Sequence, residues 1–277
     1  PFISWAAAAN DIQSAIDAAS PGDTVLVGDG SYKTGGRAKS GTTLNRVVLD
    51  KAITVRSLNG PQAVTIVGSG FPVQPSCRCA YIGPGAVLAG VTLSNGWARG
   101  EAEHPAYPDT AGGGAFLEGG GTVSNCVVEG NTAYASGGGV SGGLITHCTI
   151  RDNWSWESGG GVYSCEVRWS RLERNWTYGT GGGGNGFTMH NSVVFGNWAQ
   201  SGGGAVYEAL MDSCTVVGNQ ASLVGGGVIA ASLRNCIVYY NTDSSGSANY
   251  GFGCSFDHCC TYPYPGGTGN IAAEPKF

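Results

Sequence analysis

An asparagine recurs every 22 residues from residue 131 to residue 241 of this 277-residue chain. The column comprises Asn131, Asn153, Asn175, Asn197, Asn219 and Asn241. Two apolar columns keep the same spacing, namely Val123, Ile145, Val167, Met189, Met211 and Leu233, and Val128, Ile150, Leu172, Val194, Val216 and Val238. A fixed period of about 20 to 50 residues is typical of proteins built from stacked repeats. The sequence therefore predicts a solenoid with 22 residues in each coil.

The residues inside one repeat indicate strands rather than helices. Cys126 and Val128 alternate with Val127 and Glu129, which is the two-residue period of a β-strand. Like residues on successive coils would then stack about 4.8 Å apart, as in a parallel β-helix. The asparagines are expected at a turn, where each amide can bond the backbone of its own coil and the amide of the next.

The chain resembles the right-handed parallel β-helix proteins of the pectin-lyase-like superfamily, of the exported or surface type. The resemblance includes the amino-terminal sequence IQSAIDAASPGDTVLVGDGSY and the carboxyl-terminal sequence CCTYPYPGGTGNIAAEPKF, and it spans nearly the whole chain. It implies an all-β, right-handed parallel β-helix. The superfamily contains pectate lyases and polygalacturonases as well as adhesins and surface proteins, so the resemblance predicts a fold and not a function.

The predicted organisation is a single domain over residues 1–277, because a solenoid grows by adding coils and needs no second core. A short amphipathic helix over residues 10–20 is expected to cap the first coil. Residues 96–111 are expected to form an inserted loop, and residues 242–277 an irregular tail.

Composition and charge indicate which kinds of partner and which cellular location to expect for this protein. The net charge is −5 and the 14 Lys and Arg residues are scattered, so no nucleic-acid partner is expected. The chain begins at Pro1 without methionine and has no apolar run near 18 residues, so no membrane span is expected. These features favour an exported and processed protein, located outside the cell or at the cell surface.

Nine of the ten cysteines fall into two predicted groups, and Cys165 is expected to be buried in another column. One group shares an inward column with serines and is expected to pack the core as thiols: Cys126, Cys148, Cys214 and Cys236. The other group supplies the candidates for disulfides: Cys77, Cys79, Cys254, Cys259 and Cys260. The favoured bridge joins Cys254 to Cys259 or Cys260, which lie close by in the sequence.

Catalytic candidates gather in the inserted loop. Asn59 and Asn95 are expected to extend the asparagine column backwards in steps of 36 residues, each of which is one coil plus 14 residues. The second extra segment carries Arg99, Glu101, Glu103, His104 and Asp109. Together these side chains could exchange protons or bind a metal, and a solvated polar loop is the other interpretation.

The resemblance does not extend to catalytic residues. In the superfamily, uronide lyases use lysine or arginine near carboxylate-bound calcium, and hydrolases use clustered aspartates. The regular coils here contain no lysine, and Asp152 and Asp212 lie in different columns. No catalytic constellation is therefore recognised and catalysis is not the favoured interpretation. No cofactor or metal site is predicted, and calcium is the one ion left open.

Aromatic residues form the most informative outward columns. They are Trp154, Trp176 and Trp198, and two residues further along each coil Tyr134, Trp156 and Tyr178. Small residues stand between the two columns, as expected at an inward position. The rings could stack on a glycan, pack against a partner protein, or stack on one another and seal the turn.

A second outward stripe is apolar and is expected to be covered by the tail or by another subunit. It comprises Val193, Phe195, Val217, Ile237 and Tyr239. No capping helix follows Asn241, so the last coil is expected to be open, and the apolar segment PFISW could pair with it in a neighbouring chain. The alternative is that the tail itself covers the last coil. The favoured function is an extracellular structural or adhesive protein that assembles head-to-tail or binds a surface glycan. A polysaccharide lyase or hydrolase and a non-catalytic glycan-binding module are the alternatives.

Overall fold

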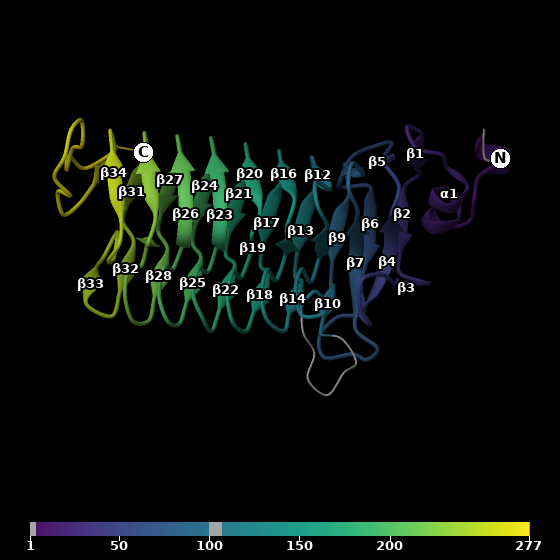
Figure 1. Ribbon diagram of the computed structural model, residues 1–277, viewed down its shortest axis with the longest axis horizontal. Helices are drawn as coiled ribbons and strands as arrows, with labels where there is room; N and C mark the ends of the chain where they lie inside the picture. Colours follow the sequence, from purple (N-terminus) through teal and green to yellow (C-terminus); the bar gives the residue numbers. More distant parts are fainter. Residues whose placement is uncertain (1–3, 100–106, 277) are drawn as a thin grey trace.

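The computed structural model describes residues 4–99 and 107–276 and confirms the predicted right-handed parallel β-helix (Figure 1). Equivalent strands of successive coils pair in parallel, and Val128 lies opposite Ile150, 22 residues later. The same step relates Val123 to Ile145. The strands belong to three long sheets, called here the A, B and C sheets, and the coils from Trp97 onward contribute to all three. The 22-residue period is thus one complete turn of the solenoid.

The A and B sheets begin in the first coil, whereas the C sheet begins at β10. The A sheet contains β1 (Thr24–Val27), β3 (Arg37–Ala38), β4 (Leu44–Leu49), β5 (Thr54–Ser57), β7 (Cys77–Ile82), β8 (Val87–Ala89), β11 (Ala115–Leu117), β12 (Thr122–Ser124), β15 (Val140–Ser141), β16 (Leu144–Thr146), β19 (Val162–Tyr163), β20 (Glu166–Arg168), β23 (Gly184–His190), β26 (Val206–Asp212), β29 (Val228–Ile229), β30 (Ser232–Arg234) and β34 (Ser255–Asp257). The B sheet contains β2 (Gly30–Tyr32), β6 (Val64–Val67), β9 (Thr92–Ser94), β13 (Val127–Glu129), β17 (Thr149–Arg151), β21 (Arg171–Glu173), β24 (Val193–Phe195), β27 (Thr215–Val217), β31 (Ile237–Tyr239) and β35 (Cys260–Thr261). The C sheet contains β10 (Trp97–Ala98), β14 (Thr132–Ala133), β18 (Trp154–Ser155), β22 (Trp176–Thr177), β25 (Trp198–Ala199), β28 (Gln220–Ala221), β32 (Thr242–Asp243) and β33 (Gly246–Ser247).

The coils turn at single residues with positive φ. The corner between the A and B sheets has φ values from 45° to 58° at Asn125, His147, Trp169, Asn191, Ser213, Asn235 and His258. Asparagine and glycine reach this region at low cost, which explains their abundance here. At the corner that leads back to the A sheet, a Cβ on Gly160 would lie 2.4 Å from the carbonyl oxygen of Trp176. The glycine triplets are therefore required by close packing of adjacent coils.

The asparagine side chains form a continuous hydrogen-bonded ladder at the corner between the B and C sheets. The Nδ2 of Asn175 donates to the carbonyl oxygen of Ile150 at 2.9 Å and to Oδ1 of Asn197 at 3.0 Å. Its Oδ1 accepts bonds from the backbone N–H and the Nδ2 of Asn153, at 3.1 and 2.9 Å. This amide thus bonds both neighbouring coils while fully buried.

In the coil before Asn131, the position that corresponds to the asparagine column is one residue later than the sequence suggests. Gly96, not Asn95, lies in the ladder position and donates its backbone N–H to Oδ1 of Asn131. Asn95 is exposed at a positive-φ corner, and exposed Asn59 bonds Asp29 instead. The predicted backward extension of the column is therefore wrong. At the other end the ladder continues past Asn241 to Oδ1 of Asn249.

A short helix covers the amino end of the solenoid, as predicted. Helix α1 (Ile12–Ala18) is capped by Asp11, whose carboxylate accepts the backbone N–H of Ser14 at 2.8 Å. Ile12 and Ile16 are buried and join the core inside the first coils. Trp5 belongs to the 3-10 helix η1 (Trp5–Ala7). The end of the segment PFISW is therefore helical and is not the strand that pairing with another chain requires. Residues 1–3 lie outside the described residues.

The tail covers the B-sheet edge of the last coil, so this edge is not open as predicted. Oδ1 of Asn270 accepts the backbone N–H of Cys259 at 2.8 Å. Ile271 exchanges backbone hydrogen bonds with Cys259 and Thr261, at 2.9 and 3.0 Å. These bonds use the backbone groups that a second chain would need at β35. These bonds concern the B-sheet edge alone, and head-to-tail assembly stays a prediction.

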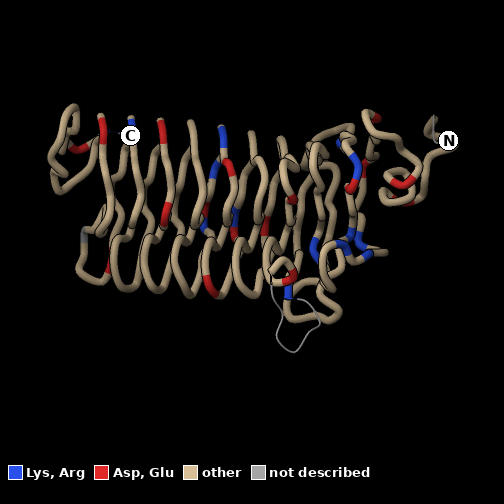
Figure 2. Tube along the Cα trace, viewed as in Figure 1, with Lys and Arg blue, Asp and Glu red and all other residues tan. Residues whose placement is uncertain are grey.

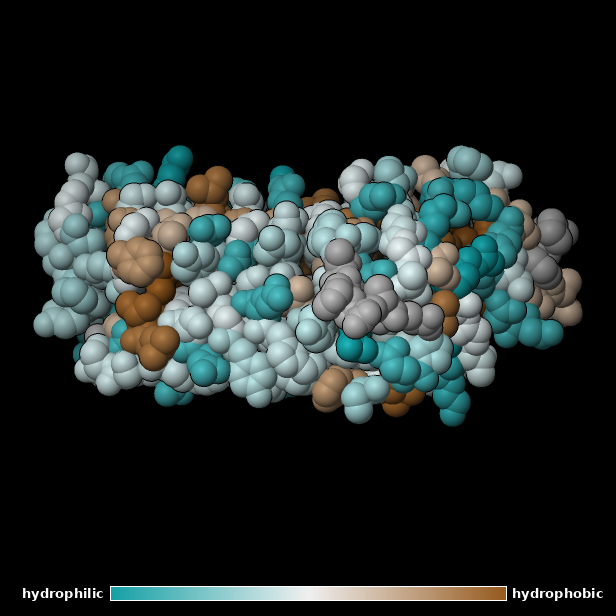
Figure 3. Space-filling view, turned by 60° about the horizontal axis from the view of Figure 1, so that its bottom comes forward, coloured by the Kyte–Doolittle hydropathy of each residue, from teal (hydrophilic) through white to brown (hydrophobic). Residues whose placement is uncertain are grey.

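The outward apolar stripe is covered only at its carboxyl-terminal end. Tyr240 donates its hydroxyl to Glu274 at 2.7 Å, which holds the tail beside β31. Phe195 stays 42% exposed, so the predicted covering by the tail is wrong there. The last coils also expose Leu223 and Val224, and Figure 3 shows hydrophobic surface gathered toward that end.

Every cysteine is a thiol, and the predicted disulfide is wrong. Cys259 belongs to the inward column and its Sγ accepts the backbone N–H of Cys236 at 3.4 Å. Cys254 lies in another inward column, one coil beyond Ala231. Both side chains belong to the core of the last coil, so they fill space instead of forming a bridge.

Charged side chains are sparse along the regular coils, and both signs occur together there (Figure 2). No helix among the described residues is long and apolar enough to cross a membrane.

The ladder predicts a large effect of one substitution. Asn175→Ala should lower the free energy of unfolding by about 1–3 kcal/mol, because buried groups on the two neighbouring coils lose their partners. Urea denaturation measures the change. Gln200→Ala removes an exposed amide and should cost less than about 0.5 kcal/mol. Equal stabilities of the two variants would contradict a supporting role for the ladder.

Burial also predicts the thiol chemistry. Burial raises the pKa of the Cys165 thiol to about 12, so this group is neutral and unreactive near neutral pH. Iodoacetamide should label half-exposed Cys260 in the native protein and leave Cys126, Cys148 and Cys165 unlabelled until denaturant is added. Mass spectrometry of the alkylated peptides checks this order, and early labelling of Cys148 would contradict it.

Candidate functional site

The outer face of the C sheet carries the aromatic columns. Trp154, Trp176 and Trp198 lie directly opposite one another on β18, β22 and β25. Ser155 and Thr177, which follow two of them, are fully buried. Because side chains alternate along a strand, both aromatic columns lie on the outside of the solenoid. The Trp side chains are half-buried.

The rings of this face contact one another closely. Trp154 stacks on Trp176 with ring centroids 4.7 Å apart and an interplanar angle of 12°. Trp156 lies 3.9 Å from Trp154, and Tyr178 lies edge-on to Trp176 at 5.4 Å. Stacked neighbours use their flat faces on each other, so Trp154 and Trp176 seal the turn. This arrangement matches the self-stacking alternative for these two rings.

Two further aromatic residues belong to this face and are missed by sequence reasoning. Trp97 occupies the tryptophan column two coils before Trp154 and is only 2% exposed. Phe71 comes from the loop between β6 and β7 and lies 5.1 Å from Trp97 and 5.4 Å from Trp154. Trp97 could have been found by placing Gly96 in the asparagine column. Phe71 has no periodic signal, because its loop is an insertion.

A cavity of about 300 Å³ joins the aromatic columns to the inserted loop. Its polar and aromatic lining consists of Tyr107, Thr110, Tyr134, Ser136, Glu157 and Tyr163. This group is called the tyrosine pocket below. Arg99 lies beside it, with its guanidinium 5.7 Å from the ring centroid of Tyr134. Glu101, Glu103 and His104 lie outside the described residues.

Regular strand geometry positions the tyrosine pocket. Val162 of β19 points into the core, so the next residue, Tyr163, points outward. Ser141, at the same place one coil earlier, is small and fully buried beneath the site. Tyr107 packs edge-on against Phe116, with ring centroids 5.4 Å apart. The pocket therefore offers phenol rings, hydroxyl groups and one carboxylate to a ligand.

Asp109 holds the chain in place and is not free for proton transfer. Its carboxylate accepts the backbone N–H groups of Thr42 and Thr43 at 2.8 Å each, and the hydroxyl of Thr42. Burial by itself would raise the pKa of Asp109, but these hydrogen bonds outweigh it and hold the pKa below its ordinary value of 3.8. Two of the five catalytic candidates lie among the described residues. Asp109 connects the inserted loop to residues 42–43, and Arg99 borders the tyrosine pocket.

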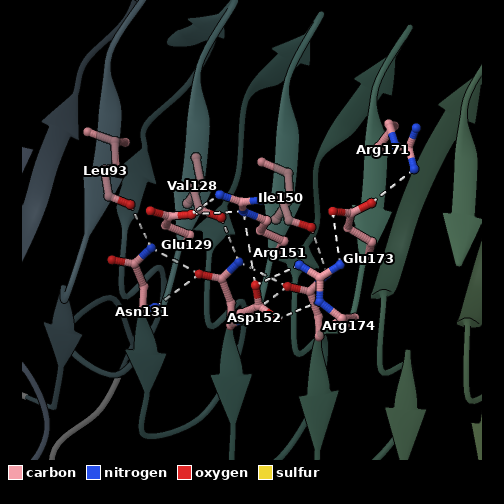
Figure 4. A network of polar contacts seen from close by, with 12 residues as sticks. Leu93, Val128, Glu129, Asn131, Ile150, Arg151, Asp152, Arg171, Glu173 and Arg174 are labelled. Atoms are coloured by element: carbon pink, nitrogen blue, oxygen red, sulfur yellow. Dashed lines mark hydrogen bonds and ion pairs between the residues drawn. The ribbon is translucent and has the colours of Figure 1, made fainter. Parts of the chain in front are cut away.

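The arginines of the B sheet are occupied in an ion network (Figure 4). Arg151 donates to Glu129 of the preceding coil at 2.8 Å. Arg174 donates through two nitrogens to the carboxylate of Asp152, at 2.9 Å each. Arg171 and Arg174 both contact Glu173, at 3.1 and 3.2 Å. These guanidinium groups are thus paired with neighbouring carboxylates.

The described part of the chain contains no group of three or more His, Cys, Asp or Glu side chains that could hold a metal ion. Calcium binding is therefore not supported by any described cluster.

No protein-family model matches the chain, and no curated protein matches it. Among solved structures, the fold is similar to that of the pectate lyase Pel9A, with a TM-score of 0.48 and 15% identity, over 90% of this chain and 73% of the lyase. It is also similar to the PL6 family alginate lyase AlyGC, with a TM-score of 0.36 and 12% identity, over 88% of this chain and 38% of that protein. At these identities the likeness concerns the fold alone.

The lowered pKa of Asp109 predicts a pH-dependent stability. Asp109→Asn should destabilise the protein near neutral pH, because the charged acceptor of Thr42 and Thr43 is lost. The carboxylate's contribution is present above the ordinary pKa of 3.8 and is lost as pH falls through the lower folded value. Urea denaturation from about pH 7 to about pH 2 should therefore show the two proteins converging in acid. A difference in the free energy of unfolding that stays constant with pH would contradict a stabilising role of the Asp109 carboxylate.

Proposed function

We propose that this right-handed parallel β-helix is an extracellular, adhesive protein that binds a glycan at the tyrosine pocket. The observation that carries the proposal is the convergence of Tyr107, Tyr134 and Tyr163 with Glu157 around one cavity of about 300 Å³. Sugar-binding sites combine flat aromatic platforms with a few hydroxyl and carboxylate groups, and this pocket has both.

The exposure of the tyrosines supports binding. Tyr107 is 62% exposed and Tyr134 is 39% exposed, although both rings contact other aromatic groups. Large exposed rings with fixed positions offer apolar area at a low cost in side-chain entropy. Glu157 can accept hydrogen bonds from the hydroxyl groups of a sugar. A protein that only had to fold would gain more by burying these rings.

The repeat favours a linear ligand. The outward column of Tyr163 continues through Asn185 to Tyr207, one residue per coil. Successive coils are about 4.8 Å apart, so a polymer lying along the solenoid axis meets a new side chain at short, regular steps. An extended chain could therefore contact the pocket and its neighbouring coils together, which would increase affinity by multivalent contact.

Binding is favoured over catalysis. Arg99 is the cation beside the pocket, and its guanidinium lies over the ring of Tyr134. Asp109 is fully engaged by Thr42 and Thr43. A uronide lyase needs a base and a second group that neutralises the substrate carboxylate, and the described residues offer no such pair. Release of unsaturated products from polygalacturonate by the intact protein would contradict this interpretation.

Two tyrosine substitutions test the proposal. Tyr134→Ala and Tyr163→Ala should each weaken binding of trigalacturonate or cellohexaose by about ten-fold, since an aromatic contact at the centre of a site often contributes more than about 1 kcal/mol. Isothermal titration calorimetry gives the dissociation constants.

Tyr262→Ala is the matched control, because Tyr262 is an exposed tyrosine of the carboxyl-terminal tail and belongs neither to the pocket nor to the column of Tyr163. It should bind as the native protein does. Equal effects at all three positions, or no binding of either oligosaccharide by the native protein, would disprove a glycan site at the tyrosine pocket.

A further inference from the structure

We propose that Phe71 occupies a sugar-binding subsite formed by Trp97, Trp154 and Trp156, and that a pyranose ring of the bound glycan displaces it. The inference rests on the proposed function and extends it, because Tyr134 of the tyrosine pocket lies 5.8 Å from Trp156. The three tryptophans are called the indole cage below. The pocket and the cage are then neighbouring parts of one binding surface.

Phe71 fills the indole cage from the loop between β6 and β7, which lies outside the coil repeat. Its ring centroid lies 5.1 Å from Trp97, 5.4 Å from Trp154 and 5.2 Å from Trp156. All three contacts are edge-on, with interplanar angles of 76°, 90° and 65°. Phe71 itself remains 47% exposed, whereas Trp97 beside it is 2% exposed. A half-exposed ring thus covers a buried one.

Two tryptophans of the cage carry a buried hydrogen-bond donor that has no acceptor among the described residues. The indole Nε1 atoms of Trp97 and Trp154 are inaccessible to solvent and make no hydrogen bond with any described residue. Native proteins leave very few buried polar groups unsatisfied, because each such group loses its hydration without compensation. The phenyl ring of Phe71 provides no oxygen or nitrogen acceptor. A sugar hydroxyl in its place would provide one.

The loop that carries Phe71 is anchored at its base and not at its tip. The backbone N–H groups of Gly68 and Gly70 donate to Ser94 and Asn95, at 3.0 and 2.6 Å. Residues 68–76 link β6 to β7 outside the coil repeat, and in Figure 1 this loop projects beyond β10. Phe71 can therefore leave the cage without breaking the sheets or the asparagine ladder.

The cage selects an uncharged sugar ring. Its walls are indoles, and no charged side chain is among the ring contacts of Phe71. The apolar face of a pyranose can replace the C–H edges of the phenyl ring against the indoles, while a hydroxyl accepts from Nε1. A charged group would lose its hydration there without an ionic partner.

Removing the Phe71 ring tests the cage. Phe71→Ala should bind cellohexaose about ten-fold more tightly than the native protein, because the cage is then open in every molecule. Phe71→Leu should also bind more tightly, and it retains an apolar side chain if the alanine variant does not fold. Val73→Ala changes an exposed residue of the same loop and should bind like the native protein. Adding Trp97→Phe to Phe71→Ala removes one donor and should reverse most of the gain.

The outcomes separate this inference from the proposed function. If the native protein binds an oligosaccharide and Tyr134→Ala weakens binding, equal or weaker binding by both Phe71 variants overturns the cage alone. If the native protein binds neither cellohexaose nor trigalacturonate but Phe71→Ala binds cellohexaose, the cage is supported and the tyrosine pocket is not. If no variant binds either oligosaccharide, both proposals are wrong.

Discussion

Hydrogen bonding between successive coils is the interaction on which this structure depends. Short strands alone would leave the backbone groups at each corner without partners, and a buried corner cannot rely on water. The asparagine ladder solves this at the turn between the B and C sheets, where each amide nitrogen donates to both neighbouring coils and each amide oxygen accepts from the preceding one. The ladder also fixes the register, since a coil of a different length would displace the amide from its neighbours.

The fixed register leaves the outward positions free to vary. The inward columns are filled by Val, Ile, Leu, Met and Cys and form one continuous core. Outside, the same regular backbone carries an ion network on the B sheet and aromatic rings on the C sheet. A rigid scaffold of this kind can place rings and hydroxyl groups along a line, which is the geometry needed to bind a polymer.

The aromatic face has two roles that depend on position along the solenoid. Trp154 and Trp176 stack on each other and protect the turn beneath them. Toward the amino end, Thr132 stands between Trp97 and Trp154 in the same column, and this small residue gives room for Phe71 and Trp156. The break in the column therefore creates the place where a ligand ring could enter.

The sequence alone determined the repeat and most of its structural consequences. The 22-residue spacing identified the coil, the inward columns, the asparagine corner and the outward direction of the aromatic residues. These are periodic features, and every coil repeats the same local physical constraints. Contacts between non-repeating segments have no such signal. The partners of Asp109, the covering of the last coil by Asn270 and Ile271, and the place of Phe71 among three tryptophans arise from insertions and termini that fold back onto the solenoid. Only the tertiary structure decided them, because their hydrogen bonds and ring contacts depend on the path of a loop and not on a spacing in the chain.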